Sequence, residues 1–128
     1  MTLTKSEAEV MRVLWKHSEG LTRGQILEYS KESGNMSWKE NSIHIILNGM
    51  LKKGAIREAG FVQCGKVYGR LYAPAISYTD YYAESLFNDA QEDDLPLLFS
   101  AMVHSDKVSL DTIAKLDTIL QERKSELT

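Results

Sequence analysis

The sequence contains little cysteine, little proline and no long apolar run. Among its 128 residues there are one cysteine, Cys64, and two prolines. A single cysteine can form neither a disulfide within the chain nor a cysteine-rich metal site. The longest uncharged stretches, residues 41–51 and 95–105, are too short and too polar to cross a bilayer. These absences exclude a disulfide-rich fold and a membrane-spanning helix, and the composition is otherwise that of a globular domain.

Features of an enzyme or of a secreted protein are also missing. His17, His44 and His104 fall in three different predicted segments, and no glycine-rich phosphate loop follows a strand. The acidic run 92–94 has no base or metal ligand at a suggestive spacing. Charged residues stand near the N-terminus, where a signal peptide would need an apolar segment. We therefore expect a cytoplasmic protein that is not an enzyme and that uses no metal or cofactor.

The net charge of −3 hides an asymmetry along the chain. Residues 1–74 contain 11 basic and 7 acidic residues, a net charge of +4, whereas residues 75–128 contain 4 basic and 11 acidic residues, a net charge of −7. A basic first part suggests an anionic partner for that part alone, although +4 also fits an ordinary solvated surface. The charge changes sign at Pro74, and we predict two regions that meet there, 1–74 and 75–128.

Capping boxes predict where three helices begin. A Thr or Ser followed three residues later by Glu or Gln occurs at Thr4, Thr22 and Ser37. The apolar spacing that follows predicts helices over residues 5–17 and 23–32, and a third helix that Gly54 ends. The third helix has the clearest apolar stripe, formed by Ile43, Ile46, Leu47, Met50 and Leu51.

After residue 54 the pattern changes from helix to strand. Residues 56–62 and 67–73 predict a hairpin with its turn at 63–66. Three short helices followed by a hairpin are typical of a winged helix-turn-helix domain. Further helices are expected over residues 78–90, 97–103 and 110–126. The predicted fold class is mostly α with a small β-hairpin: a winged helix-turn-helix domain (1–74) followed by an α-helical dimerisation region (75–128).

In a helix-turn-helix domain the outward face of the last helix enters the major groove. Asparagine can pair with adenine there, serine with several bases, and an exposed isoleucine can contact a thymine methyl group. Helix N-termini and basic side chains can hold phosphates. The candidate residues for binding double-stranded DNA are Thr22, Arg23, Ser37, Lys39, Asn41, Ser42, His44, Ile45, Asn48, Lys66 and Arg70. The alternative is a solvated helix face, because the third helix is only weakly basic.

Two residues of this region allow two interpretations each. Gly49 either weakens the third helix by about 1 kcal/mol or permits the close approach of another backbone. Trp38 either packs beside DNA or anchors the turn and the hairpin, and we favour the anchor.

The second predicted strand places basic and aromatic residues on one face. Lys66, Tyr68, Arg70 and Tyr72 alternate along it, and such a face suits a DNA backbone. Alternatively, the two tyrosines cover the joint between the two regions, especially if a bulge at Gly69 separates them from the charges. Three more tyrosines are expected to pack at the joint or to line a ligand pocket: Tyr78, Tyr81 and Tyr82.

The last predicted helix carries an apolar stripe that the acidic region is too small to bury by itself. We therefore predict a homodimer, whose two-fold symmetry would let two domains read two half-sites. The candidate dimerisation residues are Leu97, Leu98, Phe99, Ile113, Leu116, Ile119 and Leu120.

Several stretches resemble a known family. The opening Leu3–Trp15, the segment Leu51–Ile56 and the Tyr72-x-Pro74 ending of the hairpin are similar to the penicillinase-repressor family of winged-helix regulators, the BlaI, MecI and CopY type. The resemblance implies a dimeric repressor that binds a palindromic operator and is held together by its C-terminal helices.

The leading hypothesis is a sequence-specific DNA-binding transcriptional repressor that acts as a homodimer on a palindromic operator. One alternative is a winged-helix protein-interaction module that does not bind DNA. Another is a regulator that responds to a small molecule bound near the three tyrosines.

Overall fold

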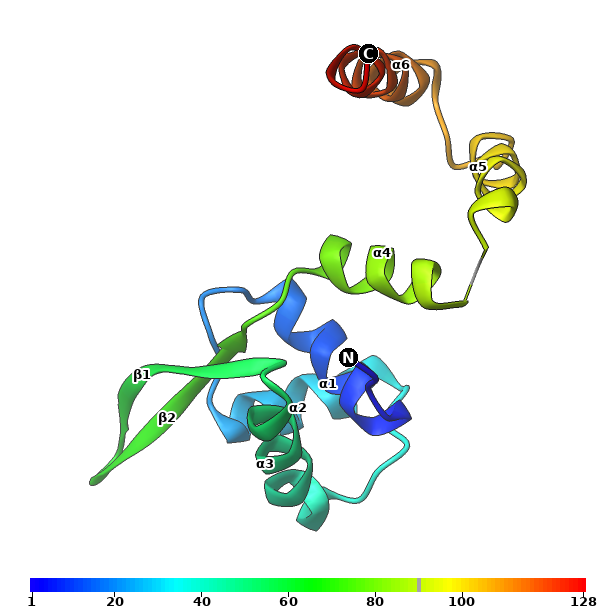
Figure 1. Ribbon diagram of the computed structural model, residues 1–128. Helices are drawn as coiled ribbons and strands as arrows, with labels where there is room; N and C mark the ends of the chain where they lie inside the picture. The colour runs from blue at the N-terminus through cyan, green and yellow to red at the C-terminus, as the bar shows by residue number, and fades with distance from the viewer. Residues whose placement is uncertain (90) are drawn as a thin grey trace. The chain divides into compact units, whose positions relative to one another are not determined.

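The structure is a computed structural model that describes residues 1–89 and 91–128, apart from the side chains of Cys64 and Val67 (Figure 1). Ala90, the expected last residue of a helix, lies outside the described residues. Within the described ranges, no helix combines the length and apolar character needed to span a bilayer. In chain order the elements are α1 (Lys5–Lys16), α2 (Arg23–Ser33), the 3₁₀ helix η1 (Glu40–Ser42), α3 (Ile43–Lys53), β1 (Ile56–Cys64), β2 (Val67–Pro74), α4 (Tyr78–Asp89), the 3₁₀ helix η2 (Glu92–Asp94), α5 (Leu95–Val103) and α6 (Leu110–Glu126).

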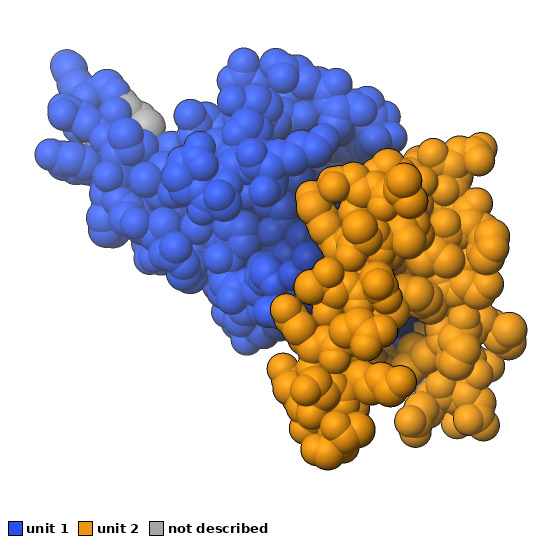
Figure 2. Space-filling view, turned by 90° about the horizontal axis from the view of Figure 1, so that it is seen from above, with its two compact units in different colours: residues 1–86 blue, residues 87–128 orange. Residues whose placement is uncertain are grey.

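The chain divides into two compact units, residues 1–86 and 87–128, which Figure 2 shows in different colours. The first contains α1, α2, α3 and a projecting hairpin, followed by most of α4 (Figure 1). The second contains α5 and α6. The predicted winged helix-turn-helix fold followed by a helical region is thus confirmed. A division of function after Pro74 stays a prediction, while the first compact unit continues to Leu86.

The first two capping boxes form as predicted. The Thr4 hydroxyl accepts the N–H of Glu7, and the Glu7 carboxylate accepts the N–H of Thr4 at 2.8 Å. Thr22 and Gln25 make the same reciprocal pair at the start of α2. Each pair satisfies two N–H groups that the helix itself cannot bond, and so it sets where the helix begins.

The third predicted capping box, at Ser37, is wrong. The Ser37 N–H and hydroxyl both donate to Glu9 Oε2 of α1, at 3.2 and 2.8 Å. The chain then passes through a 3₁₀ turn, and α3 begins only at Ile43. The Ser37 hydroxyl thus bonds to Glu9, which is distant in sequence, and not to the backbone of a following helix as the local pattern predicted.

The core of the first unit lies where α1, α2 and α3 meet the base of the hairpin. The predicted stripe of α3 is buried there, except for Leu51, which is partly buried. Trp38 is 8% exposed and belongs to this core, so its ring is buried and not presented to a partner, which favours the interpretation as an anchor. The largest fully buried side chains are Val10, Met11, Leu14, Ile26, Leu47 and Met50.

The hairpin is joined to the helices through its backbone. β1 and β2 pair antiparallel, and the N–H groups of Leu21 and Tyr72 donate to each other's carbonyls at 2.9 and 2.8 Å. The connection between α1 and α2 therefore extends the sheet at its base. The register shifts between Glu58 and Gly60 of β1, so the irregularity lies on the first strand and not at Gly69.

A buried carboxylate holds α1 against α3. Glu7 Oε1 receives the Lys53 ammonium at 2.5 Å, and Lys53 also donates to the carbonyl of Thr2. Glu7 Oε2 lies 3.2 Å from the position that a Cβ would occupy at Gly49. The glycine thus makes room for a side chain of α1, and not for the backbone considered in the sequence analysis. Burial raises the pKa of Glu7, but the hydrogen bonds and charge of Lys53, with the N–H of Thr4, outweigh it and lower the pKa below its ordinary value.

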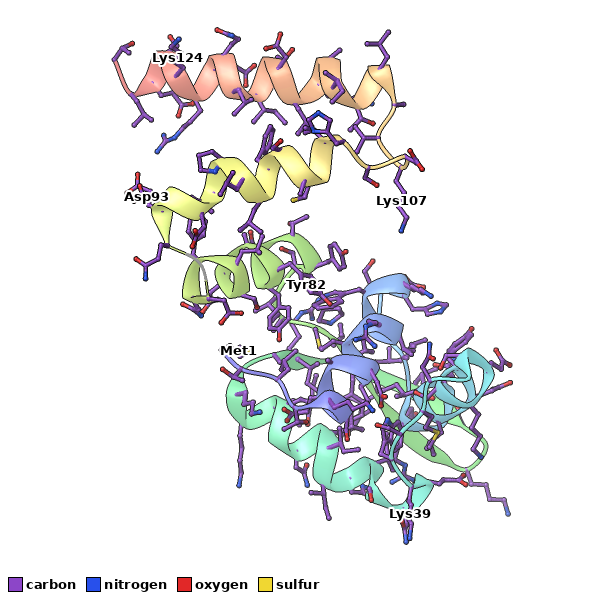
Figure 3. The ribbon with its side chains drawn as sticks, turned by 90° about the vertical axis from the view of Figure 1, so that its right-hand side faces the viewer. Met1, Lys39, Tyr82, Asp93, Lys107 and Lys124 are labelled. Atoms are coloured by element: carbon purple, nitrogen blue, oxygen red, sulfur yellow. The ribbon has the colours of Figure 1, made fainter. Side chains whose placement is uncertain are left out.

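An aromatic cluster attaches α4 to the first unit. The Trp15 ring lies 5.4 to 6.0 Å from the rings of Tyr78, Tyr81 and Tyr82. Its indole N–H donates to the carbonyl of Ile76 at 3.0 Å. Figure 3 shows Tyr82 on α4 beside α1. The expected packing role of the three tyrosines is therefore seen within this unit.

The pair Glu7–Lys53 predicts an acid-sensitive contribution to stability. Replacing Lys53 by Met leaves the buried carboxylate without its cation and should lower the free energy of unfolding at pH 7 by about 1 to 2 kcal/mol. The Glu7 contribution is present above the ordinary pKa of 4.5 and is lost as the pH falls through the lowered pKa of the folded chain. The difference between variant and wild type should therefore shrink below pH 4.5.

Urea unfolding followed by tryptophan fluorescence checks this prediction, because Trp15 and Trp38 both lie in the first unit. Lys52→Met, which removes an exposed neighbouring charge, is the control. Equal stability of the two variants across the pH range would contradict the role given to Lys53.

Candidate nucleic-acid interface

The third helix presents a polar face opposite its buried stripe. His44, Ile45 and Asn48 are exposed on this face, and η1, just before the helix, adds Asn41, which is exposed, and Ser42, which is partly exposed. Ile45 is 77% exposed although it is aliphatic. A helical period of 3.6 residues separates these positions from the buried stripe, so packing against α1 fixes the direction in which they point. The structure thus brings the predicted base-reading residues together on one accessible surface.

The N-terminus of α2 lies beside this surface. The Thr22 hydroxyl accepts the N–H of Gln25. Within the described residues, the N–H groups of Arg23 and Gly24 have no acceptor. The Arg23 guanidinium reaches α3, where its Nη1 lies 2.5 Å from Nε2 of His44. Two candidates predicted separately, one for phosphates and one for bases, are therefore in contact.

The loop before α3 contributes one accessible cation. Lys39 is exposed, and Figure 3 shows it where the loop leads into α3. Its neighbour Glu40 pairs with Lys31 at 3.1 Å. Ser37 stands apart from the other candidates, because its N–H is engaged by Glu9 and it begins no helix.

The wing, defined as β1, β2 and their turn, separates its tyrosines. Tyr68 is 72% exposed, whereas Tyr72 is partly buried against the core, so the two do not act as one face. Lys66 is exposed in the turn. Arg70 is tied to Glu58 across the strands at 3.1 Å, an ion pair that the sequence analysis missed.

Phe61 is a further wing residue that sequence reasoning missed. It lies opposite Arg70 in the register and is 66% exposed. The available signal in the sequence was an aromatic residue in a strand that also contains Arg57, Glu58 and Gln63. Its facing direction could not be derived, because the shift between Glu58 and Gly60 changes the alternation of β1.

The comparisons with known proteins agree with this geometry. The family described as penicillinase repressor matches residues 3–122. The chain belongs to the penicillinase-repressor family. It is also 32% identical over 126 residues to the penicillinase repressor of Bacillus licheniformis, an alignment that covers 96% of this chain and 92% of that protein. The chain is therefore a transcriptional repressor and not an enzyme, and the resemblance noted in its sequence is confirmed.

The first unit of this repressor has one open hollow near the three tyrosines, where the alternative hypothesis places a small-molecule ligand. It has a volume of about 370 Å³ and is lined by Trp15, Tyr78 and the segment 74–77, with Ser18 at its edge. Tyr81 and Tyr82 pack on the Trp15 ring and do not line the hollow. Among the described residues no group of three or more His, Cys, Asp or Glu side chains could hold a metal ion.

The second unit of the repressor contains an apolar groove of about 350 Å³ between α5 and α6. Of the expected dimerisation residues, four line it: Phe99, Ile113, Leu116 and Leu120. Leu97, Leu98 and Ile119 are exposed outside the groove. Val103, Leu110 and Ala114, which the sequence analysis did not single out, also line it.

Proposed function

We propose that this repressor binds duplex operator DNA sequence-specifically as a homodimer. The observation that carries the proposal is the outward face of α3, where His44, Ile45 and Asn48 are exposed, with Asn41 of η1 exposed just before them, while the other face of α3 is buried in the core. These side chains offer what base edges in the major groove require: amide groups for adenine and an aliphatic contact for a thymine methyl.

Phosphate contacts would position this face on the duplex. The N–H groups at the start of α2 and the exposed ammonium groups of Lys39 and Lys66 are suited to phosphate oxygens. Arg70 can join them when it leaves Glu58. The net charge of +4 in residues 1–74 supports the same assignment. A repressor that binds operator DNA would also act in the expected cytoplasmic location.

A second copy of the chain would cover the apolar surface of the second unit. Large side chains remain exposed there, including Leu97 at 73% and Leu110 at 85%. Burying a large aliphatic side chain contributes about 1.5 to 3 kcal/mol, so covering several of them can hold a dimer together. Two-fold symmetry then matches a palindromic operator.

The first functional prediction concerns salt. Affinity for duplex DNA should fall with ionic strength, with a slope in log–log coordinates of about −0.9 for each neutralised phosphate. Lys66→Ala should remove about one phosphate contact, so it should make the slope less steep by about 0.9 and weaken binding to all sequences alike. Asn41→Ala should instead change the preferred sequence. Fluorescence anisotropy with operator and random duplexes measures both effects.

Lys107→Ala, a charge change in the second unit, is the matched control for Lys66. If wild type binds no fragment of its genome, or binds without dependence on salt, the proposed function is wrong.

The second functional prediction concerns the ion pair on the wing. Glu58→Gln removes a negative charge and frees Arg70, and it should tighten binding to specific and random DNA by about two- to fivefold at low salt. Glu122→Gln, in the second unit, removes one charge elsewhere and should have a smaller effect. Equal affinities of the two variants would show that Arg70 does not reach the phosphates.

The third functional prediction concerns the dimer. Leu116→Asp places a charge in the groove, and an unpaired charge buried at an interface costs several kcal/mol, so the variant should sediment as a monomer. Its operator affinity should collapse, because a monomer loses the second half-site. Thr118→Asp, on the exposed surface of the same helix, should leave the dimer intact. A dimeric Leu116→Asp chain would show that the interface lies elsewhere.

A further inference from the structure

The contact between Arg23 and His44 joins the two helices of the helix-turn-helix. Arg23 is the first residue of α2, and His44 is the second residue of α3. Both side chains are exposed, so the contact lies at the surface that the proposed function places on DNA. Nη1 of the guanidinium lies 2.5 Å from Nε2 and 3.4 Å from Nδ1 of the imidazole, and the shorter distance identifies Nε2 as the partner.

The chemistry of the two groups decides which of them donates in this contact. A guanidinium has only N–H donors and no acceptor. A hydrogen bond between them requires Nε2 to accept with its lone pair, and this assigns the ring N–H to Nδ1. Once Nε2 is engaged, the pair has only N–H groups left to offer: those of the guanidinium and the Nδ1–H of the ring.

We propose that Arg23 and His44 form one recognition unit that reads a base carrying hydrogen-bond acceptors, so that Arg23 helps determine the operator sequence. The inference rests on the proposed function and deepens it. It gives the Arg23 side chain a role at the edge of a base, whereas the sequence predicted only that the helix N-terminus at Thr22 and Arg23 holds phosphate. The phosphate at the start of α2 is then left to the N–H groups of Arg23 and Gly24.

The remaining donors select among the bases. Guanine presents two adjacent acceptors in the major groove, O6 and N7, and a guanidinium can bind both. Cytosine presents its N4 amino group, a donor, which a unit made only of donors cannot satisfy. The pair should therefore favour guanine at one position of each half-site and reject cytosine there.

Selection from a duplex library with random half-sites tests the proposal. We compare wild type with Arg23→Ala, Arg23→Lys, His44→Ala and His44→Gln, all at exposed positions, and confirm by thermal unfolding that each is folded. Both alanine variants should lose the preference for guanine at the same base pair, by about 5- to 150-fold. A chain with both Arg23→Ala and His44→Ala should lose no more of the guanine preference than either single variant, because each single change already removes the whole recognition unit.

The conservative variants separate recognition from charge. Arg23→Lys keeps the positive charge, so it should keep its affinity for random DNA and still lose the guanine preference, because an ammonium lacks the planar fork. His44→Gln supplies an amide oxygen that can still accept from Arg23, so it should retain part of the preference that His44→Ala loses. Lys39→Ala is the matched control, and it should weaken binding to all sequences by one common factor.

The outcomes distinguish the inference from the proposed function. A wild-type chain that selects no sequence overturns the proposed function and the inference with it. A wild-type chain that selects an operator while Arg23→Ala weakens every sequence equally overturns the inference alone. Loss of preference at two different base pairs in the two alanine variants would also overturn it, because the residues would then read independently.

Discussion

The orientation of the recognition surface depends on one buried carboxylate. Glu7 closes the first turn of α1 through the N–H of Thr4, receives the ammonium of Lys53 from the end of α3, and lies against Gly49 in the middle of α3. Together with the burial of the apolar stripe in the core, these contacts hold the inner face of α3, so that its other face points outward. A larger residue at position 49 would press on Glu7, so the glycine that weakens the isolated helix improves its packing.

Local rules predicted the fold where local interactions decide it. Thr4 and Thr22 cap their helices as the pattern required, because each partner lies three residues away on the same helix. Ser37 fits the same pattern, yet its hydroxyl donates to Glu9 of α1 and caps no helix, and α3 begins later, at Ile43. The shift between Glu58 and Gly60 likewise depends on how the two strands pair, which the composition of one strand does not encode.

The candidate site divides along the same line. The exposed face of α3 was predictable, because the buried stripe leaves the remaining positions outward. The contacts Arg23–His44 and Arg70–Glu58 were not, because each joins elements whose approach is set by the packing of the whole unit. Sequence reasoning therefore named Arg70 as a cation for phosphates and Arg23 only for the N-terminus of its helix, whereas the structure gives each side chain a specific partner.

These partners bear on why the proposed operator binding would use two half-sites. A cation already paired within the protein must exchange that partner for a phosphate, so it adds less affinity than a free one. With Arg70 paired and Arg23 directed to a base under our proposal, Lys39 and Lys66 are the expected phosphate-binding side chains that have no ion pair among the residues described. One unit would then bind weakly but selectively. Joining two units on one duplex makes the second binding event intramolecular, which supplies affinity without added positive charge and preserves the selectivity that α3 provides.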